Sequence, residues 1–117
     1  MKRHFAAILA IVLIFSCTAC GSKRVTGISD RAYELGLSAL ETADDYISGK
    51  IDATTAENNL ERASILIDDD GSDGENNILV SSAITLLQIS ISNKRNGTGT
   101  MSSVEEHRER LADLLGK

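Results

Sequence analysis

The spacing of aliphatic residues at intervals of three and four, in a chain without proline, constrains the fold most strongly. Residues at these intervals lie on one face of an α-helix, and four segments of the chain show such a face. Ala, Leu and Glu, which favour helix, are abundant between them, and no proline interrupts them. We therefore predict an all-α fold, a small bundle of three to four helices over about 29–48, 54–69, 77–92 and 103–115.

The first two predicted helices form an antiparallel hairpin. Asp30 can cap the start of the first helix, and Gly49 supplies the left-handed residue that ends it. Thr54 and Glu57 have the spacing of a capping box at the start of the second. A connection of about five residues leaves room only for an antiparallel return. The predicted inward residues are Ile28, Ala32, Leu35, Ala39, Ala43, Tyr46 and Ile47 in the first helix, and Ala56, Leu60, Ala63 and Ile67 in the second.

The third predicted helix is the most apolar one, and 78–91 contains no charged residue. Two adjacent stripes run along it, Leu79–Ala83–Leu86 and Val80–Ile84–Leu87–Ile91. Most of its circumference should therefore be buried, as in the central helix of a bundle. Its β-branched residues and the alternation in QISIS are also compatible with a buried strand.

The last predicted helix begins after two serines, Ser102 and Ser103, each followed three residues later by a glutamate. This is the spacing of a capping box, here doubled. Val104, Leu111, Leu114 and Leu115 should face inward. On the outer surface, Glu106 with Arg110 and Glu105 with Arg108 have the spacing of helical ion pairs.

The N-terminus has the pattern of a secretory signal. A basic start, 1–4, precedes eleven residues without a polar side chain, Phe5 to Phe15. Eleven helical residues extend about 16 Å, roughly half of a 30 Å hydrocarbon core, so this run is too short to span a bilayer stably. It suits the apolar core of a signal peptide. A buried N-terminal helix is the alternative, although such a helix usually has a polar face and this run has none.

Both cysteines of the chain, Cys17 and Cys20, follow this run. The segment Thr18-Ala19-Cys20-Gly21 resembles the lipobox of bacterial lipoproteins, a short aliphatic-small-small-Cys pattern after the apolar core. The resemblance implies a diacylglyceryl group on the thiol of Cys20 and cleavage just before it. The chain would then consist of a signal peptide, 1–19, a lipidated tether, 20–27, and a helical domain, 28–117.

A second lipobox register places the lipid on Cys17. Ile14 and Ser16 fit that register, but bulky Phe15 stands where a small residue is usual. In the register of Cys20, Cys17 itself stands where the family usually has Leu. We favour Cys20 because Ala19 and Thr18 before it and Gly21 after it match well.

Lipidation would place the chain at a membrane and make that membrane its first partner, through the lipid anchor. Two acyl chains on one residue meet the usual requirement for a lasting anchor. We expect the chain at the cell membrane, lipid-anchored on the extracytoplasmic face, and in the outer membrane or periplasm if its host has two membranes. Neither zinc nor another cofactor is expected, because Cys-x-x-Cys needs a second ligand pair and His107 is the only histidine after Cys20.

The charge of the predicted mature chain argues against a nucleic-acid partner. Removing Lys2 and Arg3 from the 12 basic residues leaves 10, against 17 acidic ones. So negative a chain is repelled by phosphate backbones. Both phenylalanines fall within the signal, so the core must be built from Leu, Ile, Val and Ala.

The acidic segment 68–75 is the one candidate ligand site. Asp69, Asp73 and Glu75 are weak candidates for a metal. A calcium-loop register that puts Gly74 sixth places Val80 at the twelfth position, where the bidentate Glu should stand. We therefore favour a hydrated turn, and any calcium affinity should be no tighter than about millimolar.

Enzyme signatures are missing from the sequence. Gly36-Leu37-Ser38-Ala39-Leu40 lacks the final glycine of a nucleophile elbow, and no serine precedes a lysine by three positions. His107, among charged neighbours on a predicted helix, suits a solvated surface position. We expect no enzyme but a protein-interaction module of the envelope. The alternative is a protein that binds a small ligand, or calcium weakly, through 68–75.

Overall fold

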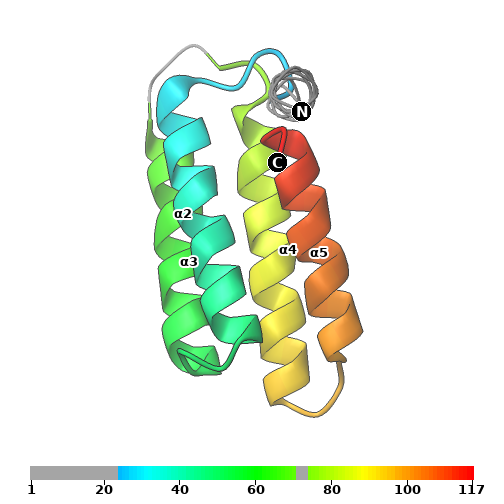
Figure 1. Cartoon of the computed structure of the whole chain (residues 1–117). Helices are drawn as coiled ribbons and strands as arrows, with labels where there is room; N and C mark the ends of the chain where they lie inside the picture. Colours follow the sequence, from blue (N-terminus) through cyan, green and yellow to red (C-terminus); the bar gives the residue numbers. More distant parts are fainter. Residues whose placement is uncertain (1–23, 71–73) are drawn as a thin grey trace, which may run out of the picture.

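The computed structural model describes residues 24–70 and 74–117, which form an all-α bundle. Its helices are α2 (Asp30–Ile47), α3 (Ala53–Asp69), α4 (Asn77–Arg95) and α5 (Met101–Leu114), and they run side by side, up and down (Figure 1). The described residues contain no strand, so 78–91 is helical as favoured. The predicted bundle is confirmed, with α4 ending three residues later and α5 starting two residues earlier than expected. The predicted signal peptide and Cys20 lie outside the described residues.

The helix starts differ from the predicted caps, because the residue that caps each of α2, α3 and α5 lies directly before the observed helix in an extended conformation. The Ser29 hydroxyl accepts from the Ala32 N–H at 3.1 Å, where Asp30 was expected to cap. Helices α3 and α5 are capped by Asp52 and Thr100, and not by the predicted capping boxes. These side chains accept from the N–H groups of Thr55 at 2.8 Å and Ser103 at 3.2 Å. All three caps satisfy N–H groups that lack a partner in the first turn.

Three helix ends share one glycine motif. Gly49, Gly97 and Gly116 follow α2, α4 and α5 with φ values of 83°, 79° and 71°. After α2, the N–H of Gly49 bonds the Tyr46 carbonyl at 3.1 Å and the N–H of Lys50 bonds the Asp45 carbonyl at 2.8 Å. This pair of bonds is the Schellman motif, in which a left-handed residue satisfies the last carbonyls. The predicted role of Gly49 is thus confirmed.

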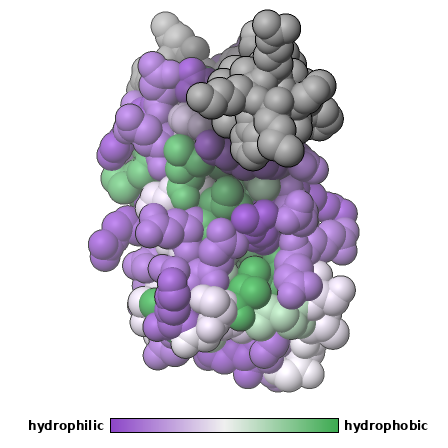
Figure 2. All heavy atoms as spheres, in the orientation of Figure 1, coloured by the Kyte–Doolittle hydropathy of each residue, from purple (hydrophilic) through white to green (hydrophobic). Residues whose placement is uncertain are grey.

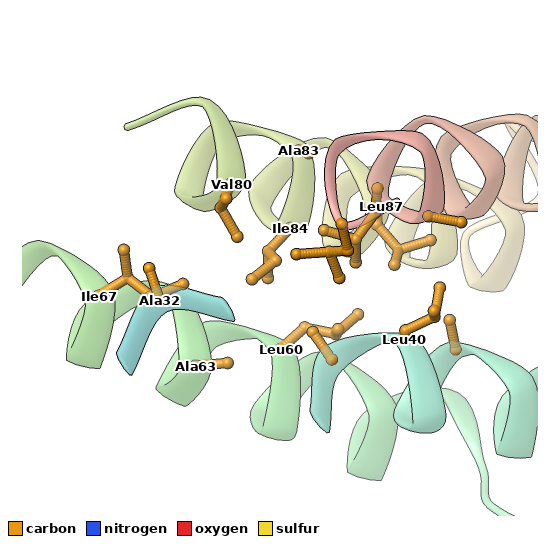
Figure 3. Packing of buried hydrophobic residues seen from close by; sticks show 14 of the residues in the cluster. Ala32, Leu40, Leu60, Ala63, Ile67, Val80, Ala83, Ile84 and Leu87 are labelled. Carbon is orange, nitrogen blue, oxygen red and sulfur yellow. The ribbon is translucent and has the colours of Figure 1, made fainter. Parts of the chain in front are cut away.

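The core is aliphatic and lies around α4, which contacts all three other helices. Val80, Ile84 and Leu87 of α4 point toward Leu60 of α3 and Leu40 of α2 (Figure 3). Helix α4 thus packs against all three other helices, as predicted for a central helix, but one side of it is not covered. The predicted inward residues of α3 are all buried, whereas Leu35, Tyr46 and Ile47 of the first predicted stripe are only partly buried.

A cluster of hydroxyl groups joins α3 to α4 within this packing. The Ser64 hydroxyl lies 3.0 Å from that of Ser81 and 3.1 Å from that of Thr85. Thr85 donates to the Ser81 carbonyl at 3.0 Å. Because hydroxyl groups donate and accept, the cluster satisfies itself without a charge at this buried contact.

The segment before α2 is attached to the bundle. The N–H of Val25 donates to the Leu114 carbonyl at 2.9 Å, at the end of α5. Asn76 donates from its side chain to the Thr26 carbonyl and from its backbone to the Gly27 carbonyl. Residues 24–27 of the predicted tether are therefore bonded to α5 and to the start of α4.

Candidate interaction surface

Helix α4 exposes large apolar side chains on the side opposite the core. Ile78, Leu79, Leu86 and Ile89 are 67%, 43%, 44% and 48% exposed. At about 100° per residue, these four and the exposed Ser82 fall within an arc of about 100°. We call these five residues the α4 outer stripe. The buried stripe of α4 lies on the other side, so the helix is apolar on both.

The α4 outer stripe also lacks charge. Residues 77–93 contain no charged side chain, although charged residues make up 25% of the chain. The solvent faces of the other three described helices carry charges, such as Glu34, Glu61 and Glu105. A solvent-facing helix surface normally carries charged groups, and a contiguous exposed apolar surface marks an interaction site.

An open groove of about 430 Å³ runs beside this stripe, between α4 and α5. Leu79, Ser82 and Leu86 form its α4 side, and Leu114 and Val25 also line it. Its polar rim comes from α5, as His107, Arg110 and Asp113. An apolar floor with a few polar groups at the rim is the usual composition of a protein-binding surface.

This surface corrects two predictions. Leu79 and Leu86 were expected to be buried with Ala83, but only Ala83, 9% exposed, is. The three neighbours of α4 cover the opposite face and leave this one open. His107 was expected to be a solvated surface residue, but it is half-buried and lines the groove.

The charged groups of α5 connect it to α2 and to each other. Arg108 donates to Asp44 of α2 at 2.9 Å and to Glu109 at 2.8 Å, so the predicted pair with Glu105 does not form. The hydrogen bond to Asp44 raises the pKa of Arg108 above its ordinary value. The predicted pair of Glu106 and Arg110 forms, at 2.7 Å. The cationic side chain on the groove rim is thus already paired.

The acidic segment lies at the end of α3. Asp69 is its last residue, Glu75 is exposed before α4, and Asp73 lies outside the described residues. Asp68 and Asp70 line a hollow of about 210 Å³ there. Within 24–70 and 74–117, no three His, Cys, Asp or Glu side chains are grouped so that they could hold a metal ion.

No protein-family model matches the chain, and no match was found among curated proteins or solved structures. Among the described helices, none is long and apolar enough to cross a membrane. The functional proposal therefore depends on the sequence pattern and on the surface described above. The missing charge in 77–93 was the sequence signal for that surface; the spacing alone pointed to burial.

Proposed function

We propose that the protein is a bacterial lipoprotein that holds a non-catalytic, protein-binding helical module at the extracytoplasmic face of a membrane. The proposal depends on the order of three features at the N-terminus. A basic start comes first, an eleven-residue apolar run follows, and Thr18-Ala19-Cys20-Gly21 comes after that run. A run of that length suits a signal peptide, and a cysteine directly after it suits lipid attachment.

The attachment of residues 24–27 is consistent with a short anchor. Arg24 pairs with Asp30 and lies 4.9 Å from the ring centre of Tyr33, so the chain is held to the bundle from its first described residue. Arg24 is four positions after Cys20 in the chain, and four extended residues span at most about 14 Å. A lipid on Cys20 would thus keep the end of the bundle at Val25 and Leu114 close to the bilayer.

Protein binding is the activity that the exposed surface suits best. The α4 outer stripe and the groove together offer apolar contact area with a polar rim at one side. Small-ligand or weak calcium binding through 68–75 is the alternative, and the hollow beside Asp68 and Asp70 is the feature that would serve it.

Single cysteine variants of the full chain, expressed in a bacterium, test the anchor. Cys20→Ser should abolish incorporation of labelled fatty acid and move the protein to the soluble fraction. Cys17→Ser should leave both unchanged and serves as the matched control. The reverse result would assign the lipid to Cys17, and membrane retention of the double variant would contradict the proposal. Mass spectrometry of the mature N-terminus would identify the acceptor independently.

A further inference from the structure

The α4 outer stripe has properties that select one kind of partner. We propose that it binds the same stripe of a second copy of this chain in the same membrane, with the two α4 helices parallel. This inference rests on the proposed lipid anchor, which sets the relative direction of the copies.

The first argument is charge. When two identical subunits pair about a two-fold axis along parallel helices, residues near the axis face their own copies. A charged residue there would meet a like charge at close range. Helix α4 has no charge over 77–93, whereas α2, α3 and α5 each expose acidic residues in a chain of net charge −5. Among the described helices, α4 alone can meet its own copy over this length without such repulsion.

The second argument is spacing. Ile78, Ser82 and Ile89 are four and seven residues apart, so they recur along one line of the helix, as the residues of a seam between two packed helices do. The small Ser82 in this seam lets the backbones approach, and an isoleucine at each end supplies apolar contact. Leu79 and Leu86 widen the contact toward the groove on the α5 side.

The third argument is direction. An anchor within about 14 Å of Arg24 holds one end of each bundle near the bilayer. Two copies in one membrane therefore share the same end. An antiparallel pair would place the two anchored ends at opposite ends of α4, which has 19 residues and is about 28 Å long. Only the parallel pair lets both copies stand on the bilayer together.

The α4 outer stripe is small, so we expect two copies to pair only when both are anchored in the membrane. From Ile78 to Ile89 the stripe is about 17 Å long on a helix about 10–12 Å wide. This is well below the roughly 800 Å² per partner of a standard stable interface. Confinement to one bilayer raises the local concentration of the partner, as a linker does, and so makes weak contacts sufficient.

Disulfide trapping of the full chain in isolated membranes tests the pairing. In a parallel pair, Ile89→Cys and Ile78→Cys should each give a covalent dimer on mild oxidation, because each position faces its own copy. Ile65→Cys is the matched control, since Ile65 of α3 is 50% exposed and Ile89 is 48% exposed. We expect about tenfold more dimer from Ile89→Cys than from Ile65→Cys, and a large loss of that dimer when Cys17 and Cys20 are also serine.

The outcomes separate the pairing from the anchor. Membrane-bound Ile89→Cys that gives no more dimer than Ile65→Cys would contradict the pairing and leave the lipoprotein proposal intact. Co-expressed Ile78→Cys and Ile89→Cys chains that join mainly to each other would contradict the parallel direction. Trapping of a different protein would contradict a second copy as the occupant. A chain that is not in the membrane at all would contradict the proposed function itself.

Discussion

The buried side-chain amide of Asn77 makes two hydrogen bonds with Ser29, 48 residues earlier in the chain. Its Oδ1 accepts from the backbone N–H of Ser29 at 2.9 Å, and its Nδ2 donates to the Ser29 hydroxyl at 3.0 Å. The same hydroxyl caps α2, and Asn77 is the first residue of α4. One polar contact thus fixes the starts of two helices against each other.

Replacing Asn77 with alanine should therefore destabilise the bundle. Asn77 is 7% exposed, so the substitution removes both bonds and leaves the N–H of Ser29 without its acceptor. A lost partner of this kind costs about 1–3 kcal/mol in free energy of unfolding. Thermal or urea unfolding of Asn77→Ala would measure it, with the exposed Asn59→Ala of α3 as control. Equal stability of the two variants would contradict this role.

The contrast between Asn77 and the helices shows what the sequence could predict. Spacing located all four helices because a helix buries one face of its own local pattern. The Asn77–Ser29 contact joins residues from different elements, and Asn77 lies just after the acidic segment 68–75, which indicated only a turn. The exposure of Leu79 and Leu86 was missed for a related reason. An apolar face shows that a residue suits burial, but the number of neighbouring helices decides whether it is buried.

Gly36 allows the close approach of α2 to the end of α5. A Cβ at this position would lie 2.8 Å from Cδ2 of Leu115 and 3.2 Å from Cγ1 of Val80, both buried. Alanine improves helix propensity by about 1 kcal/mol, but overpacking costs about 1–3 kcal/mol. We expect Gly36→Ala to lower the free energy of unfolding by about 1 kcal/mol, measured by urea unfolding.

A double variant tests the cause of that effect. In a Leu115→Ala background only the 3.2 Å approach to Val80 remains, so Gly36→Ala should cost less stability than in the unchanged chain, or become stabilising through its helix propensity. The same loss in both backgrounds would show that Leu115 is not responsible.

Calcium should stabilise the domain only slightly. With a dissociation constant of about 1 mM or weaker, 1 mM calcium adds at most about 0.4 kcal/mol, a shift in melting temperature of no more than about 3 °C. Thermal unfolding with and without 1 mM calcium checks this, with magnesium as control. Micromolar binding by calorimetry that Asp69→Ala abolishes would overturn it and favour the ligand-binding alternative.

The cap of α3 should make stability depend on pH. The hydrogen bonds that the Asp52 carboxylate accepts from Thr55 lower its pKa below the ordinary value of 3.8. Because the folded pKa is lower than the unfolded one, the contribution of Asp52 is present above pH 3.8 and is lost as pH falls through the folded pKa. Asp52→Ala should thus have a lower free energy of unfolding than the unchanged chain at pH 7. This difference should become smaller as the pH falls below 3.8.

Asp52→Asn supplies the control for charge. The side-chain oxygen of the asparagine can still cap the helix but does not titrate in this range. The free energy of unfolding of Asp52→Asn should therefore rise relative to that of the unchanged chain as the pH falls below about 4. Urea unfolding of the three proteins at pH 7 and pH 3 measures both differences, and the other carboxylates cancel because all three proteins share them. If the difference in free energy of unfolding between the unchanged chain and Asp52→Ala were the same at both pH values, the ionised carboxylate would not stabilise α3. The cap would then act through its shape alone.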